Sequence, residues 1–244
     1  MVLVGHGSRL PAVKADLARL ARTVSGLTGL DVEPSGQADL TETLDRLVAQ
    51  GPSEIIVQPY FLGLVGALAL RLRERIRRWE SAYVGFKVSL GEPIGDHPFL
   101  TAAIGDSALR CLAGRKGALV LVGHGSPDPG WSRSLHAQVS RLQRLGLFER
   151  VLPAFLAHEG PRLEEALHGL RGEVAVVPFF LSRGFHTSVE LPQLLDGAGR
   201  PSSRPRLAPF WASDPRIAHA VAQRLVTPAR LPRRGATLPV TRQG

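Results

Sequence analysis

The apolar positions of the chain alternate between short continuous runs and longer stretches with helical spacing. Runs such as EVAVVPFF at 173–180 are nearly unbroken, which is typical of strands buried on both faces of a parallel sheet. The pattern predicts strands at about 1–5, 30–34, 54–59, 84–90, 118–122, 150–156, 173–178 and 205–208. It predicts helices at about 10–25, 39–49, 66–80, 97–111, 131–144, 161–169, 187–195 and 214–225. Such regular alternation requires crossover helices, so we predict α/β domains with parallel sheets covered on both faces.

Three segments of the first half recur in the second half, in the same order and at nearly one offset. These pairs are LVGHGS at 3–8 and 121–126, VQPYFL at 57–62 with VPFFL at 177–181, and EPIGDHP at 92–98 with APFWASDP at 208–215. A recurrence of this kind indicates a duplicated domain. We therefore predict two tandem three-layer α/β/α domains, each with a four-stranded parallel sheet, at residues 1–112 and 113–226.

The chain is basic, with 30 Lys and Arg against 21 Asp and Glu and a formal net charge of +9. This surplus attracts anions of any kind, but the 6% aromatic content and the lack of a recognised binding motif argue against a nucleic-acid partner. No apolar run approaches the roughly 18 residues that span a bilayer, and MVLVGHGSRL has no leader pattern, so we expect a cytoplasmic protein without a membrane partner. Residues 227–244, rich in Pro, Arg, Gly and Thr, are predicted to be a disordered basic tail.

The cysteine count limits the kinds of metal site that the chain can form. Cys111 is the single cysteine, which excludes an intramolecular disulfide and a four-cysteine site. Any metal must therefore be bound by histidine or carboxylate, and the eight histidines make this feasible.

The GHGS motif follows the first predicted strand of each copy and carries His6 and His124. Ligands of parallel sheets bind at the carboxyl ends of the strands, so both imidazoles are candidates for function. The alternative is a structural histidine that packs under a tight turn. Phosphoryl transfer is disfavoured because Gly5 and Gly123 stand where histidine phosphatases have an arginine.

Two further ionisable residues at strand ends are present only in the second copy. His186 lies in VVPFFLSRGFHTSVELP and aligns with Ala67, and Glu159 lies in FLAHEGPRLEEAL and aligns with Gly36. Together with His124 they come from three strand ends of one sheet and can converge. Two imidazoles and one carboxylate form a suitable metal-ligand set, so we predict a metal site in the second copy and a degenerate site in the first.

These motifs resemble those of the CbiX-type sirohydrochlorin chelatases over about residues 1–225. The resemblance implies insertion of Co²⁺, Fe²⁺ or Ni²⁺ into sirohydrochlorin, a polycarboxylate tetrapyrrole, on the route to sirohaem or cobalamin. It implies that His124, Glu159 and His186 are both the metal ligands and the catalytic residues, which take up the ion and accept the pyrrole protons. The metal is a substrate, and no organic cofactor is expected.

Four other residues are expected to contact the substrate or its metal, and these are Arg183, Ser126, Glu190 and His6. For Arg183 the alternative is a plain solvated charge. The expected partners are the tetrapyrrole and the divalent metal, with the chain a monomer or a weak homodimer. A non-catalytic metal or tetrapyrrole carrier is the competing hypothesis, because a sequence pattern does not distinguish turnover from binding.

Overall fold

The computed structural model describes residues 1–7, 10–52, 54–64, 66–83, 85–128, 130–198 and 203–226. The first copy contains β1 (Val2–Gly5), α1 (Pro11–Thr28), β2 (Glu33–Gly36), α2 (Leu40–Val48), β3 (Ile55–Pro59), α3 (Gly66–Ala82), β4 (Val88–Leu90) and α4 (Pro98–Leu112). The second copy contains β5 (Gly117–Gly123), α5 (Arg133–Arg144), β6 (Val151–Phe155), α6 (Leu163–His168), β7 (Gly172–Pro178), a π-helix (His186–Glu190), α7 (Leu191–Ala198), β8 (Ser203–Leu207), a 3₁₀ turn (Trp211–Ser213) and α8 (Arg216–Val226).

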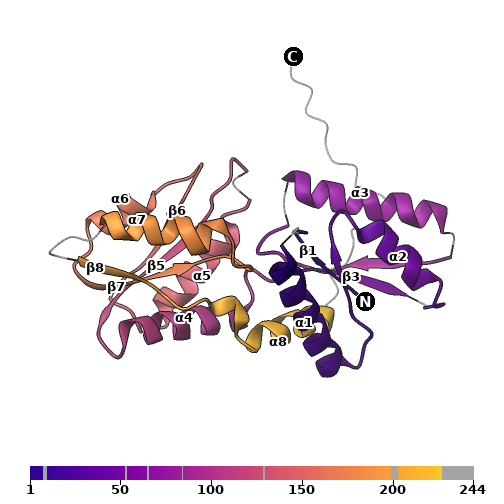
Figure 1. The fold of residues 1–244 in the computed structure, drawn as a ribbon, viewed down its shortest axis with the longest axis horizontal. Coiled ribbons are helices and arrows are strands. Elements are labelled where there is room, and N and C mark those ends of the chain that lie inside the picture. Colours follow the sequence, from indigo (N-terminus) through magenta and orange to yellow (C-terminus); the bar gives the residue numbers. More distant parts are fainter. Residues whose placement is uncertain are drawn as a thin grey trace, which may run out of the picture.

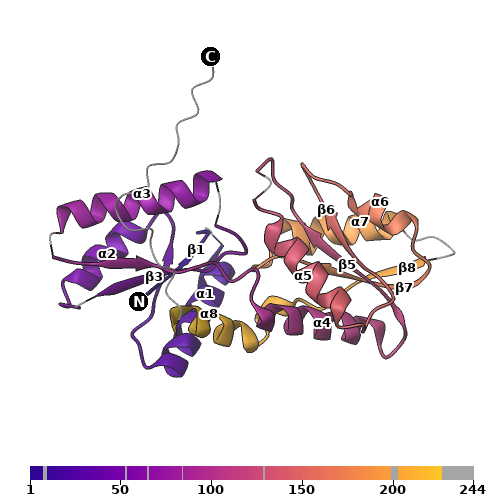
Figure 2. The ribbon, with the colours of Figure 1, turned by 180° about the vertical axis from the view of Figure 1, so that it is seen from behind.

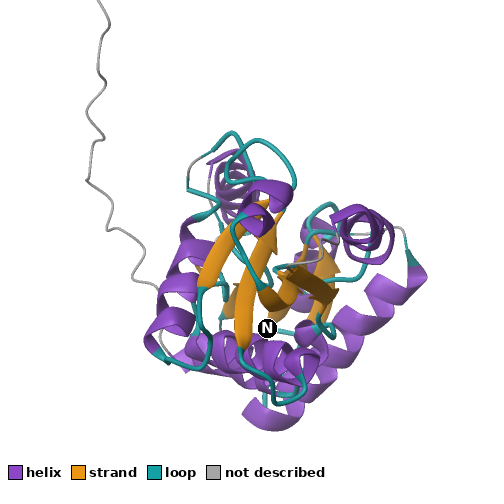
Figure 3. Cartoon of the chain, turned by 90° about the vertical axis from the view of Figure 1, so that its left-hand side faces the viewer, coloured by secondary structure: helices purple, strands orange, loops and turns teal. Residues whose placement is uncertain are grey.

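The strands form two four-stranded sheets of the same topology, with the orders β2-β1-β3-β4 and β6-β5-β7-β8. Every strand pair in both sheets is parallel. Figures 1 and 2 show the two halves side by side with helices around each sheet, and Figure 3 shows strands lying between helical layers. The predicted fold of two repeated α/β units is therefore confirmed.

The central strands are buried on both faces, as their continuous apolar runs predict. All residues of β5 are buried, and side chains from its two faces belong to two different hydrophobic clusters. Helix α3 buries one stripe, Leu68, Leu72, Ile76 and Trp79, against the first sheet. Burial on both faces fixes the strand positions, and hence the loops that leave their carboxyl ends.

The last helix of each copy packs against the other copy. Helix α4 lies against β7 of the second sheet, whereas α8 lies beside α1 and contacts β3 of the first sheet (Figures 1 and 2). Ion pairs accompany this exchange, since Arg216 lies 2.7 Å from Asp106 and Arg224 lies 3.1 Å from Glu92. The two sequence copies therefore share one continuous core, which includes Leu3 and Leu121.

Most predicted elements lie within a few residues of their observed positions, and the main shifts have local causes. Strand β2 begins at Glu33 rather than near residue 30, because α1 continues to Thr28 and ends at Gly29, whose φ is +70°. The predicted strand at 84–90 is shorter, with β4 covering Val88–Leu90. The tail at 227–244 lies outside the described residues. Across the helices that are described, none is both long enough and apolar enough to cross a membrane.

Candidate active site

His124 is positioned by the tight turn that leaves β5. Gly125 has a φ of +82°, and a Cβ at this position would overlap the carbonyl oxygen of Ala157. Glycine is therefore required for the turn to pack against the loop that follows β6. Two backbone hydrogen bonds join the same segments, from Leu156 N to Gly123 O at 3.0 Å and from Ala157 N to His124 O at 2.7 Å. Backbone hydrogen bonds thus join the GHGS motif to the 156–162 loop.

The structure brings His124 and His186 together at the carboxyl edge of the second sheet. Their ring centroids are 4.8 Å apart, with an interplanar angle of 66°. The His124 Nδ1 atom lies 2.9 Å from the carbonyl oxygen of Gly125, which can only accept a hydrogen bond. This contact places the proton on Nδ1 and leaves the lone pair on Nε2. His124 therefore presents Nε2 as a ligand atom.

His186 is oriented in the same way by Glu190. Its Nδ1 atom is 2.5 Å from Oε2 of Glu190, so an Nδ1–H donor faces the carboxylate and Nε2 is left as the acceptor. The ring stacks on Phe180 with centroids 5.8 Å apart, and the ring of Phe185 meets it edge-on at 5.9 Å. Residues His186–Glu190 form a π-helix, a rare element that often occurs at functional sites.

Glu159 lies in the same cluster of loops, but its carboxylate faces a backbone amide. Its Oε1 atom accepts a hydrogen bond of 3.0 Å from Ser126 N, and the Ser126 hydroxyl accepts one of 3.1 Å from Asp128 N. Within the described part of the chain, no group of three or more His, Cys, Asp or Glu stands ready to hold a metal ion. The structure thus assembles the two predicted imidazoles, while the predicted role of Glu159 as a third ligand stays a prediction.

His158, which the sequence analysis did not single out, lies close to this pair. Its ring centroid is 5.9 Å from that of His124, and its side chain is exposed. His158 is one of two described non-glycine residues with a positive φ, here +63°. The sequence feature that could have identified His158 is its position directly before Glu159, just after a strand. Nothing in the sequence pattern showed that the loop directs this side chain toward His124.

The equivalent place in the first copy has different neighbours. His6 Nδ1 lies 3.4 Å from Nε2 of Gln37, and its ring contacts Phe61 edge-on at 4.5 Å and stacks with Trp131 of the second copy at 6.2 Å. Burial lowers the pKa of His6 below its usual value. His6 is therefore surrounded by an amide and two aromatic rings, an arrangement unlike that of His124.

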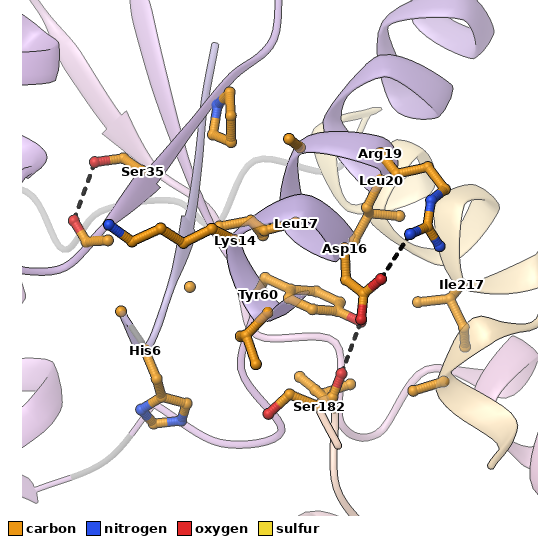
Figure 4. Close-up of a pocket in the computed structure, with 18 of the residues that line it drawn as sticks. His6, Lys14, Asp16, Leu17, Arg19, Leu20, Ser35, Tyr60, Ser182 and Ile217 are labelled. Carbon is orange, nitrogen blue, oxygen red and sulfur yellow. Dashed lines mark hydrogen bonds and ion pairs between the residues drawn. The ribbon is translucent and has the colours of Figure 1, made fainter. Parts of the chain in front are cut away.

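A cavity of about 1160 Å³ lies between the two copies, beside the loop that leads to His186. His6 and Lys14 border it from the first copy, and Ser182 and Ile217 from the second (Figure 4). Arg183 also lines it, with its guanidinium 5.2 Å from the ring centroid of Phe210. The predicted substrate contact at Arg183 thus faces this cavity. Its volume is slightly above the range of about 300–1,000 Å³ that is usual for small-molecule sites.

Taken together, the fold and these contacts define a duplicated α/β protein with a pair of oriented imidazoles at the carboxyl edge of its second sheet. A family model described as CbiX matches residues 1–110 and again residues 118–227. The chain therefore belongs to the CbiX family, and the double match agrees with the internal repeat.

The chain is also similar to curated relatives and to a solved structure. The sirohydrochlorin ferrochelatase of Bacillus subtilis is 26% identical over 194 residues, covering 75% of this chain and 74% of the relative. A sirohydrochlorin cobaltochelatase of Methanopyrus kandleri is 35% identical over 83 residues, covering 32% of this chain and 57% of the relative. The structure of SirB from Bacillus subtilis with Fe³⁺ has a TM-score of 0.82 at 24% identity, covering 92% of this chain and 93% of SirB. This likeness shows that the two proteins share a fold.

Proposed function

We propose that the protein is a sirohydrochlorin chelatase that inserts Co²⁺ or Fe²⁺ into the macrocycle, with its active site in the second copy. The observation that carries the proposal is the pair of imidazoles, His124 and His186, whose Nε2 atoms are both left free by hydrogen bonds at Nδ1. Family membership and the activities named for the relatives support the substrate and the reaction.

The imidazole pair fits the first step, which is the capture of a divalent ion. Neutral imidazole is a good ligand for Fe²⁺ and Co²⁺, and it exchanges these ions more readily than thiolate would. The hydrogen bond from His186 to Glu190 fixes the orientation and the tautomer of the ring, as carboxylates do behind metal-binding histidines. The two rings can therefore hold the ion, strip part of its water shell and present it to the macrocycle.

Insertion of M²⁺ into the macrocycle releases two protons from pyrrole nitrogens, so the site needs proton acceptors. Once the ion has passed to the macrocycle, the Nε2 atoms of His124 and His186 become free to accept protons. Glu159 is a third acceptor in the same group of loops, and it is held by Ser126 N. The charges balance, because one divalent ion enters and two protons leave.

The cavity between the copies offers two basic side chains to the carboxylates of the substrate, and acidic residues line it as well, namely Asp16, Asp39, Glu42 and Asp214. Lys14 and Arg183 line it, and no ion pair is found for either residue among the described side chains. Arg183 is three residues from His186 in the sequence, and we expect it to contact the periphery of a macrocycle bound over the imidazoles. The net charge of +9 further favours approach of a polyanion.

The proposal is tested by mixing the protein with an excess of sirohydrochlorin and Co²⁺ and following the absorption spectrum under anaerobic conditions. A chelatase completes many turnovers, whereas a carrier shifts the spectrum of at most one equivalent. His124→Ala and His186→Ala should each lower the rate by at least about 100-fold, the lower end for loss of a proton-transfer residue.

The repeat supplies the matched control for these substitutions. His6 stands in the same hexamer as His124 but lacks the histidine partner, so His6→Ala should stay within about tenfold of the wild type. Circular dichroism checks that each variant is folded. A larger loss with His6→Ala than with His124→Ala would place the active site in the first copy. Equal, mild effects of all three variants on an active wild type would contradict the assignment of the site to His124 and His186.

A further inference from the structure

His158 adds a third imidazole to the pair at the edge of the second sheet. Two imidazoles that bind one ion through metal–nitrogen bonds of about 2.1 Å have ring centroids about 4.5 to 6 Å apart. The centroid of His124 lies 4.8 Å from that of His186 and 5.9 Å from that of His158. Both separations are in the range expected for rings that share a metal.

The backbone holds His158 in a conformation that few residues adopt. The hydrogen bond of 2.7 Å from Glu159 N to Ala157 O closes a three-residue turn with His158 at its centre. With a φ of +63° this is a γ-turn of the rare, strained form. Flanking bonds secure the loop, from Ala157 N to His124 O at 2.7 Å and from Phe155 N to Pro161 O at 2.9 Å. Local strain of this kind is commonly retained where it directs a side chain at a functional site.

We propose that His158 is a third ligand for the divalent metal substrate, completing a site of three imidazoles with His124 and His186. The inference rests on the proposed chelatase function, because the same ion is then passed to the macrocycle. His158 closes on the ion by rotating its exposed side chain, since the described side chains do not stand in a ready three-ligand arrangement. Exposed side chains change rotamer within nanoseconds, so this closure does not limit capture.

A third imidazole has a clear chemical role in this position. Two ligands hold an ion such as Co²⁺ weakly in water, whereas three replace more of its water shell while leaving positions open for the incoming macrocycle. His124 and His158 are both exposed, and the side chain of His186 is 40% exposed, so solvent reaches all three rings.

The test measures Co²⁺ binding to the full chain without tetrapyrrole, by calorimetry and by visible d–d absorption. His158→Asn removes the imidazole while tolerating the positive φ, and His158→Gly is a second variant with no cost at that φ. Both should weaken Co²⁺ binding by at least about tenfold and change the d–d spectrum. His168→Ala, which removes an exposed histidine of α6, should leave both unchanged.

Turnover measured in parallel separates this proposal from the proposed function. In His158→Asn the apparent KM for Co²⁺ should rise by at least about tenfold, with the KM for sirohydrochlorin unchanged. Wild-type affinity and spectrum in both folded His158 variants would overturn the role of His158, even if the protein is an active chelatase. An absence of wild-type Co²⁺ binding would overturn it as well. Wild-type protein without turnover would instead contradict the chelatase function.

Discussion

The hydrogen bond between His186 and Glu190 gives a direct test of how the site is oriented. Glu190→Ala removes the acceptor that holds the Nδ1–H group of His186, which lies 2.5 Å from Oε2. Glu190→Gln retains an acceptor oxygen but removes the negative charge. The pair of variants therefore separates the orientation of the ring from its electrostatic support.

The size of the effect follows from the type of bond and its exposure. A hydrogen bond to a charged group contributes about 1.5–3 kcal/mol. The side chains of His186 and Glu190 are 40% and 31% exposed, so water screens part of the interaction and the lower end of that range applies. About 1.5 kcal/mol corresponds to roughly tenfold in rate, so Glu190→Ala should lower kcat/KM for Co²⁺ insertion by about tenfold. Glu190→Gln should have an intermediate effect.

The assay combines kinetics with a readout of the tautomer. Insertion of Co²⁺ is measured at saturating sirohydrochlorin, and nitrogen NMR reports which ring nitrogen of His186 carries the proton. Glu164→Ala on α6 is a matched control, because it removes an exposed carboxylate of the same half. The reasoning is refuted if Glu190→Ala keeps the wild-type rate and the wild-type nitrogen shifts of His186.

Three further predictions address other parts of the molecule. Because burial lowers the pKa of His6, the unfolded chain binds a proton at this imidazole more readily than the folded chain does below about pH 6.5. The free energy of unfolding, measured with urea, should therefore fall as the pH drops through that range, and it should fall less steeply in His6→Phe. Gly66→Ala should destabilise the protein by about 1–2 kcal/mol, because the φ of Gly66 is +54° and a Cβ would overlap the Asp128 carboxylate. Adding Asp128→Ala should restore part of that loss, and wild-type stability of Gly66→Ala alone would contradict the packing. Arg183→Ala should raise the KM for sirohydrochlorin and leave Co²⁺ affinity unchanged, and an unchanged KM would show that Arg183 is a solvated charge.

The fold could be predicted largely from sequence because two signals agreed. Unbroken apolar runs marked strands buried on both faces, and the repeated hexamer at 3–8 and 121–126 placed the same strand in each copy. The exchange of α4 and α8 between the copies could not be predicted. An amphipathic helix has an apolar stripe that fits either sheet, and the choice depends on loop paths and side-chain fit across the whole molecule.

In the candidate site, too, some contacts could be predicted from the sequence pattern and others depend on the folded geometry of a loop. Strand ends of one sheet meet at one edge, so the nearness of His124 and His186 followed from their positions after β5 and β7. The contact between Glu159 and Ser126 N, by contrast, depends on how the 156–162 loop is folded. The positive φ of His158 belongs to that same loop, and no periodic pattern encodes it.

The contacts around Trp131 join the loop that follows β5 to the first copy. Trp131 follows the GHGS motif of the second copy and stacks on His6, while Asp128 of the same loop packs over Gly66. This loop also carries Ser126, whose backbone amide holds Glu159. Residues of the first copy thus contact the same loop that carries Ser126.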